Sequence, residues 1–281
     1  HGGHVDRLIV KRIVEKNVKQ DLLTTSIYIA TGIIGIAVFV YPLFMQQLST
    51  AGNEPLQSSE NIAPLLTLLL VVISLSVLFL EVQGQAVSAK LIASLGVLVA
   101  ATASLRFLEV AIPGPGGFSP MFVPIILTGY VFGARFGFLM GTMTMLVSGL
   151  ITGGIGPWLP YQMFAAGWIG LTSGWLPHLK NQRAQLIMLV LVGIAWGILF
   201  GMIMNLYFWP FMGANDASSW ESGNSLTDSL TRYFVFYLST SFIWDVARAA
   251  GNGLLITFLG LPTVVVLTRF RDKFQFEVQS T

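Results

Sequence analysis

The sequence predicts an all-α polytopic membrane protein. Hydrophobic residues make up 54% of its 281 residues and charged residues only 10%, and the mean hydropathy is +0.74. A soluble domain carries about 25% charged residues, so the chain is too poor in charge for that class. Several apolar runs approach or exceed the roughly 18 residues that a helix needs to cross a bilayer. We therefore expect a bundle of membrane-spanning helices.

Eight apolar segments define the expected spans. They cover residues 22–44, 63–80, 91–112, 119–133, 136–152, 161–176, 186–209 and 233–267. The breaks between them are the polar stretch 46–61, a short link with Glu81 and Lys90, the Pro113 to Gly117 segment, Ala134-Arg135, the glycine and proline loop 153–160, the basic link 177–185 and the polar loop 211–231. Proline and glycine clusters are typical of such connections between helices.

The charges divide between the two sides of this eight-span arrangement. Twelve of the fifteen basic residues fall on one side: five before the first span, Lys90, Arg135, Lys180, Arg183 and three in the C-terminal tail. The acidic residues Glu54, Glu60, Asp216, Glu221 and Asp228 fall in loops of the opposite side. Because cytoplasmic loops carry the excess of Lys and Arg, this distribution predicts cytoplasmic N and C termini.

Composition and missing motifs exclude several classes of function. The chain has no cysteine, which removes disulfides, thiol chemistry and cysteine-ligated metals. It lacks the phosphate-binding loop of ATPases and the motifs of zinc proteases and serine hydrolases. The net charge of +2 is too small to indicate a nucleic acid partner. We expect no catalytic residues, no metal site and no enzyme activity.

Small residues recur every four positions in three of the expected spans. The stripes are Gly193, Gly197, Gly201 and Asn205 in the seventh span, Gly96, Ala100 and Ser104 in the third, and Ala166, Gly170 and Gly174 in the sixth. This spacing lets helices approach closely in lipid. Packing inside one bundle is the simpler interpretation of any single stripe, whereas an unused stripe would dock a partner membrane protein. We favour docking for the third-span stripe, which continues to Ala93.

Two pairs of opposite charges lie at membrane depth. Arg106 and Glu109 are one turn apart near the outer end of the third span, and Asp245 and Arg248 are one turn apart in the eighth. Ser241 and Asn252 extend the second pair into a polar helix face. Such groups cost about 2.5–3.5 kcal/mol each on insertion scales and face a bundle interior or a cavity. They form either intrahelical salt bridges that lock helices together or a polar ligand site in the outer half of the membrane.

Aromatic and amide side chains fall at the same outer level and favour the ligand site. They are Trp158, Tyr161 and Gln162 at the start of the sixth span, and Asn205, Tyr207 and Trp209 at the end of the seventh. Binding sites combine apolar walls with a few oriented polar groups. Trp and Tyr also anchor helices at membrane interfaces without any role in binding, so each of them has this second interpretation.

Three segments carry a resemblance to a known family. Phe118 to Gly133 reads FSPMFVPIILTGYVFG, Gly153 to Met163 reads GGIGPWLPYQM, and Trp244 to Asn252 reads WDVARAAGN ahead of a basic tail. These segments resemble the substrate-binding S components of energy-coupling factor (ECF) transporters. The similarity covers about residues 90–273. The first two expected spans, residues 22–80, depart from the family pattern, and their role is open: a membrane anchor, an accessory hairpin or an added partner contact.

The resemblance implies an organisation for the chain. We expect a basic amphipathic segment at 1–21, a two-helix extension at 22–89, a six-helix S-component core at 90–268 and a basic cytoplasmic tail at 269–281. We leave the opening His1 to His4 out of the functional reasoning as a trimmed start or an expression remnant. The family also implies a multi-pass protein of a bacterial or archaeal cell membrane.

The family resemblance further implies a function in uptake. An S component captures a vitamin or similar micronutrient from outside, and a membrane T subunit with two cytoplasmic ATPases drives its import. ATP is then used only by the partner ATPases, and no cofactor is bound covalently. Family S components meet the T subunit through small residues of their first core helix, which here carries Ala93, Gly96 and Ala100. They are thought to topple in the bilayer, and the Pro113 to Gly117 loop would be an external gate.

These observations lead to one expected function and two alternatives. We expect a binder of a small water-soluble nutrient, with a cobalamin-type or other large, partly polar ligand as the first guess. The expected substrate-binding residues are Arg106, Glu109, Trp158, Tyr161, Gln162, Asn205, Trp209, Asp245, Arg248 and Asn252. The alternatives are an ion-coupled secondary transporter that uses Asp245 and Arg248 as a relay, and a structural membrane assembly protein.

Overall fold

The computed structural model describes residues 89–111, 116–156, 158–209, 218–219 and 225–276, with isolated positions between 26 and 39 and Val72. The continuous helices are α3 (Ala89–Ala111), α4 (Phe122–Phe132), α5 (Ala134–Thr152), α6 (Leu159–Ser173), α7 (Gln182–Phe208), α8 (Leu226–Thr240) and α9 (Phe242–Phe276). The described part of the chain contains no strand, which confirms the predicted all-α class. Four stretches of these helices are long and apolar enough to span a membrane: Ile92–Ala111, Ala134–Thr152, Gln182–Phe208 and Phe242–Lys273.

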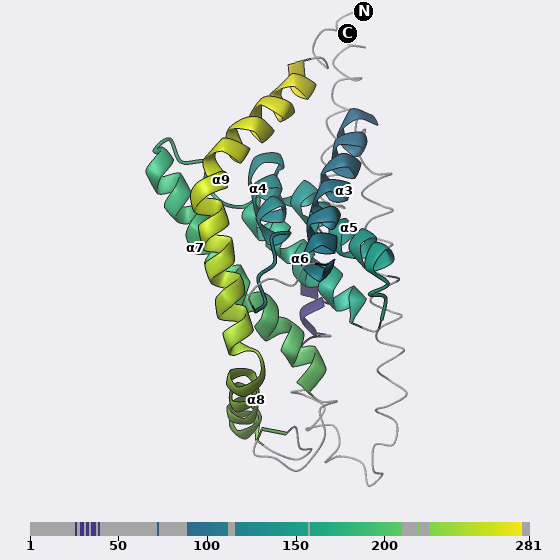
Figure 1. Cartoon of the computed structure of the whole chain (residues 1–281), viewed down its shortest axis with the longest axis vertical. Helices are drawn as coiled ribbons and strands as arrows, with labels where there is room; N and C mark the ends of the chain where they lie inside the picture. The colour runs from purple at the N-terminus through teal and green to yellow at the C-terminus, as the bar shows by residue number, and fades with distance from the viewer. Residues whose placement is uncertain are drawn as a thin grey trace, which may run out of the picture.

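The sequence prediction of a single last span was wrong at its start. Residues 233–267 were expected to form one helix, but the chain forms α8 up to Thr240, breaks at Ser241 and begins α9 at Phe242. The Ser241 amide donates to the Tyr237 carbonyl of α8 at 3.0 Å, and the Ser241 carbonyl accepts from the Asp245 amide of α9 at 3.0 Å, so Ser241 is the junction of the two helices. Ser241 therefore lies before α9 and does not belong to its polar face. Figure 1 shows α8 at the end of the bundle beyond the start of α9.

Helix α4 is the short central element of the bundle. Nine of its eleven residues are buried, and it packs against α5, α6, α7 and α9. The turn to α5 passes through Gly133, whose φ of 94° favours glycine. Figure 1 shows that α7 crosses α9, and that α3 and α5 lie on the opposite side of α4 from α9.

The small-residue stripe of α6 packs inside the bundle. A Cβ added to Gly170 would lie 1.9 Å from the carbonyl oxygen of Gly137 on α5, and one added to Gly129 on α4 would lie 2.3 Å from the Gly170 oxygen. Gly174 meets the backbone of Ala134 just as closely, at 2.1 Å. Backbones at this distance leave no room for side chains, so the interpretation as internal packing holds for this stripe.

The glycine stripe of α7 packs inside the bundle as well. Gly193 faces Ile256, Gly197 faces Ala249 and Gly201 faces Asp245, all three on α9. Asn252 Nδ2 adds a hydrogen bond of 3.0 Å to the carbonyl oxygen of Gly193. The polar face of α9 therefore lies on the glycine face of α7. Pro262 lies inside α9, and Figure 1 shows that this helix bends.

Two described positions of the first expected span, Gly35 and Phe39, pack onto α6. A Cβ on Gly35 would lie 2.7 Å from the Trp168 side chain, and the ring of Phe39 meets Tyr161 edge-on with centroids 5.0 Å apart. The rest of this span apart from its isolated described positions, the second span apart from Val72, and the segments 1–21, 112–115 and 277–281 lie outside the described residues. The four-part organisation of the chain stays a prediction.

Candidate functional site

A buried ion pair lies near the beginning of α9. Arg248 Nη1 binds Asp245 Oδ1 and also donates to the carbonyl oxygen of Gly197 at 3.2 Å. The guanidinium carbon of Arg248 lies 5.7 Å from the ring centre of Phe122 and 5.5 Å from that of Phe200. Asp245 is only 1% exposed. The sequence left a salt bridge or a ligand site open for each charged pair; in this pair the salt bridge forms, and the contacts of Arg248 join α9 to α7 and α4.

The packing of α7 creates the space for the Asp245 carboxylate. A Cβ on Gly201 would lie 1.9 Å from Asp245 Oδ2 and 2.0 Å from Oδ1, so only glycine fits at this position. Asp245 Oδ2 and the Tyr237 hydroxyl are both buried, and the two groups lie close enough to interact, so each is a polar neighbour of the other. Buried polar atoms of this kind call for a partner.

The second charged pair is arranged differently. Arg106 Nη1 points at two thioethers, 3.3 Å from Met145 Sδ and 3.6 Å from Met121 Sδ. Glu109 accepts a hydrogen bond of 2.6 Å from the Ser119 hydroxyl. Among the described residues no ion pair joins Arg106 to Glu109, although their charges interact. Because thioethers are weak acceptors and a guanidinium has five N–H donors, most of the hydrogen-bonding capacity of Arg106 remains unused by these contacts.

The fold brings the two pairs into one neighbourhood. The charge of Arg248 acts on both Arg106 and Glu109, although they lie on different helices. The turn at residues 116–119 connects them. A Cβ on Gly117 would lie 2.3 Å from the Trp244 carbonyl oxygen, and Phe118 fills the space beside Gly251 on α9. We call the four residues Arg106, Glu109, Asp245 and Arg248 the charged site. The four residues and the side chains that contact them come from α3, α4, α5, α7 and α9.

The aromatic residues at the start of α6 lie in a different cluster. Tyr161 is 1% exposed and stacks on Tyr207 with ring centroids 3.8 Å apart. It is part of a buried cluster with Phe39, Phe138 and Phe164, whereas the neighbours of the charged site are part of the main core. Trp158 is 45% exposed and its indole N–H donates to the Gly154 carbonyl at 3.2 Å. Gln162 is half-buried.

The predicted residues at the end of α7 are also buried to different degrees. Trp209 is fully buried, donates from Nε1 to the Ser218 carbonyl at 2.7 Å and packs with Tyr233, Phe236 and Tyr237 of α8. In this structure it therefore holds α8 against α7. Asn205 has a buried Nδ2 without a hydrogen-bond partner, and Asn252 has an unpartnered Oδ1. The roles of all three in substrate binding stay predictions.

Several residues around the charged site are not identified by the sequence reasoning. They are Ser119, Met121, Phe122, Met145, Phe200 and Tyr237, which contact or neighbour the four charges. Methionine and phenylalanine in an apolar helix look the same whether they face lipid or a buried cation. The one signal in the sequence that could have identified some of these residues is the family resemblance, because the segment from Phe118 to Met121 carries part of it.

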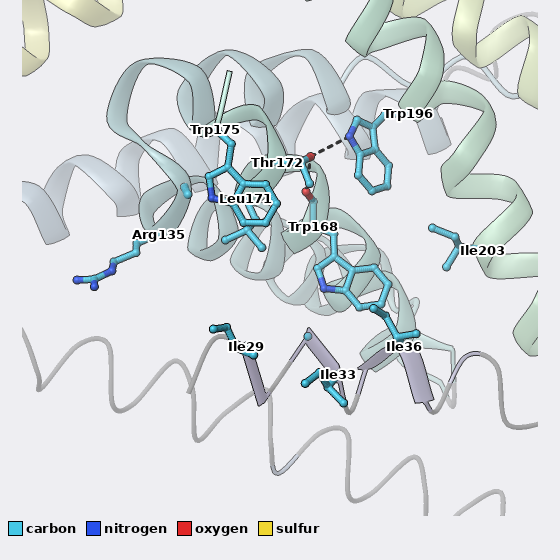
Figure 2. Close-up of a pocket in the computed structure, with 12 residues that line it drawn as sticks. Ile29, Ile33, Ile36, Arg135, Trp168, Leu171, Thr172, Trp175, Trp196 and Ile203 are labelled. Atoms are coloured by element: carbon cyan, nitrogen blue, oxygen red, sulfur yellow. Dashed lines mark hydrogen bonds between the residues drawn. The ribbon is translucent and has the colours of Figure 1, made fainter. Parts of the chain in front are cut away.

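A large apolar cavity lies elsewhere, between the first expected span, α6 and α7. Its volume is about 620 Å³, and its lining includes Ile29, Ile33, Trp168, Trp175 and Trp196, with Arg135 at its edge (Figure 2). Thr172 also lines it, and its hydroxyl accepts a hydrogen bond of 3.0 Å from Trp196 Nε1. None of the predicted substrate-binding residues lines this cavity.

Comparison with known proteins agrees with this architecture. The sequence model of the family described as "ECF transporter, substrate-specific component" matches residues 90–260, which is more than half of the chain. Among curated proteins and solved structures none matches. Substrate-specific components are membrane transport proteins that bind substrate, and they are not enzymes. The family implies a small-molecule substrate together with T-subunit and ATPase partners. The matched region begins in α3 and ends in α9, and it contains apolar helices long enough to span a membrane. The protein is therefore a multi-pass membrane protein that belongs to the family of substrate-specific components of ECF transporters.

Proposed function

We propose that the protein captures a small water-soluble vitamin or micronutrient from outside the cell and that the charged site binds a polar part of it. The observation that carries this proposal is the position of Arg106, whose guanidinium contacts two thioethers and no carboxylate within ion-pair distance among the described residues. A cation at membrane depth usually has a strong acceptor as its partner. A ligand carboxylate, phosphate or carbonyl would be that acceptor.

The other groups of the charged site suit the same role. Asp245 and Arg248 are held by α7 and two phenyl rings, so their positions are set before any ligand arrives. A site arranged in advance binds with a smaller ordering cost. Glu109 and Ser119 offer hydrogen-bonding groups next to Arg106. The remaining predicted residues, Trp158, Tyr161, Gln162, Asn205, Trp209 and Asn252, would act as walls or as further polar contacts.

The face of α3 is the surface that we propose for the T subunit. Ala93, Gly96 and Ala100 are all exposed among the described residues, and a Cβ on Gly96 would meet nothing within 4 Å. Unlike the stripes of α6 and α7, this one does not pack against the described helices. An exposed small-residue stripe lets a second membrane helix approach closely. The T subunit would bring two cytoplasmic ATPases, which alone would use ATP, and this chain would need no covalently bound cofactor.

The orientation follows from charge. Lys180 lies between α6 and α7, and Arg183 lies in the first turn of α7. Arg269, Arg271 and Lys273 lie near the end of α9, and Figure 1 shows that the start of α7 and the end of α9 lie toward the same end of the bundle. We propose that this end and both termini face the cytoplasm of a bacterial or archaeal cell. The charged site then lies in the outer half. Toppling in the bilayer would carry the ligand inward, and residues 113–117 would gate the outer side. A cobalamin-type molecule is the first ligand to test.

The test is mass spectrometry of small molecules released from the detergent-purified protein. The proposal expects one compound at near one per chain, and the same compound, added back, raises the melting temperature by mass action. A panel that includes cobalamin, riboflavin, thiamin, biotin and folate would then be tested for the same stabilisation. A protein that releases no compound and that no compound stabilises would contradict the proposal.

A further inference from the structure

We infer that the apolar cavity between the N-terminal extension and the family core is a binding site for one phospholipid with an anionic headgroup. Its acyl chain would lie between the first expected span and the tryptophans of α6 and α7, and its phosphate would lie at Arg135. This site is separate from the charged site and does not depend on the identity of the transported substrate.

The walls of the cavity come from two parts of the chain. Ile29, Gly32, Ile33 and Ile36 belong to the extension, and α5, α6 and α7 supply the opposite wall. The family match begins only at residue 90, so four of the twelve lining residues come from a part of the chain that the shared core does not contain. Gly35 and Phe39 fix this wall, because they contact Trp168 and Tyr161 closely. The extension and the core therefore form the cavity together.

The chemistry of the lining selects an apolar occupant. The volume of about 620 Å³ is within the range of roughly 300–1,000 Å³ that holds small molecules. Isoleucine, leucine and tryptophan side chains form most of its surface. Thr172 offers little to a ligand, since its hydroxyl already donates to the Trp168 carbonyl at 2.8 Å and accepts from Trp196. A water-soluble nutrient would lose its hydrogen bonds with water here and gain almost none, whereas an acyl chain has none to lose.

The edge of the cavity selects a charged headgroup. Arg135 lies in the first turn of α5, and Figure 2 shows its guanidinium directed away from the tryptophans toward the outside of the cavity. Trp175, which is 67% exposed, lies at the same edge. Nearby, Arg271 Nη1 donates to the Val131 carbonyl at the end of α4, at 2.9 Å. Tryptophan and arginine at one level are typical of the membrane interface, and basic pockets between membrane helices bind anionic lipid headgroups.

The experiment is native mass spectrometry of the full-length protein, delipidated in detergent and then titrated with phosphatidylglycerol or phosphatidylcholine. We expect one tightly held phosphatidylglycerol per chain and about fivefold weaker retention of phosphatidylcholine, the effect of one basic residue. Arg135→Gln should remove this preference. Arg183→Gln, an exposed arginine that does not line the cavity, is the matched control and should keep it.

The acyl-chain half of the site has its own pair of variants. A Cβ on Gly32, which lines the cavity, meets nothing within 4 Å, and the same holds for Gly96, which lies on α3 outside it. Gly32→Leu should therefore fill the cavity and abolish lipid retention, while Gly96→Leu should leave it unchanged. Brominated phosphatidylglycerol should quench tryptophan fluorescence in the wild type and less in Gly32→Leu, which gives a second readout on folded protein. No retained lipid in the wild type, or equal retention by Gly32→Leu, would overturn the inference.

Discussion

Gly201 on α7 and the carboxylate of Asp245 on α9 occupy adjoining space that no side chain could share: a Cβ on Gly201 would lie 1.9 Å from Asp245 Oδ2. This relationship explains why a carboxylate can lie at membrane depth in this protein. The missing side chain lets α7 cover Asp245, and the carbonyl of Gly197 then receives Arg248 Nη1 at 3.2 Å. The glycine stripe of α7 thus serves both close helix packing and the charged site.

Gly201→Ala should destabilise the protein. The added methyl group would overlap both carboxylate oxygens of Asp245, and overpacking of this kind costs about 1–3 kcal/mol. We expect a lower melting temperature in detergent. Gly96→Ala is the matched control, because its Cβ meets nothing within 4 Å, and it should melt like the wild type. Equal melting of Gly201→Ala and the wild type would show that α7 and α9 do not approach as described.

Asp245→Asn and Arg248→Gln should each destabilise the ligand-free protein, since each leaves the opposite charge buried. Breaking a buried pair costs about 3–5 kcal/mol. The double variant should lose less than the sum of the two single losses, because residues in contact are coupled. The measurement is a double-mutant cycle of unfolding free energies in detergent. Additive losses would mean that the two side chains do not depend on each other.

Arg106→Gln should weaken substrate binding far more than it changes stability. The guanidinium contacts two thioethers, at 3.3 and 3.6 Å, so its removal leaves no carboxylate without an ion-pair partner in the described structure. A lost charge-assisted hydrogen bond of about 1.5–3 kcal/mol corresponds to about 10- to 150-fold in affinity. Calorimetric titration with the compound that co-purifies measures this change. Arg183→Gln is the control, and unchanged affinity of Arg106→Gln would place the ligand elsewhere.

Leucine at Ala93, Gly96 and Ala100 should abolish association with the T subunit and its ATPases. Larger side chains on this exposed face would hold the partner helix away, while the substrate site stays intact. Co-purification from membranes that contain all subunits tests this, with ligand affinity as the second readout. Ala195→Leu, an exposed alanine on α7, should retain the partners. If the triple variant keeps the T subunit, the partner docks on another face.

Much of the fold follows from the sequence because lipid imposes simple rules. The apolar segments and the basic clusters predict membrane helices, and the described structure agrees with most of their limits. The break at Ser241 was not predicted, because the polar run Ser239-Thr240-Ser241 is short and apolar residues flank it on both sides. The glycine stripes predict close packing, but their spacing does not say which helix they meet. That α9 is the partner of α7 depends on the whole topology.

The sequence predicts less of the candidate site than of the fold. Charged residues at membrane depth identify Asp245 and Arg248, because their cost demands a partner. For Arg106 and Glu109 the same argument leaves a salt bridge or a ligand site open, and in the structure they contact Met145 and Ser119. The spacing of two charged residues along one helix does not reveal which side chains outside that helix offer them other contacts. Trp209 shows the same limit, since only the folding of α8 against α7 decides that it is buried.

The most direct test of the central claim is uptake of the co-purifying compound into liposomes that contain this protein with and without its T subunit and ATPases. We expect accumulation only in the complete assembly with ATP on the ATPase side, because this chain carries the binding site and the partners supply the energy. Uptake by the protein alone, driven by a proton or sodium gradient and abolished by Asp245→Asn, would contradict the account and identify an ion-coupled transporter.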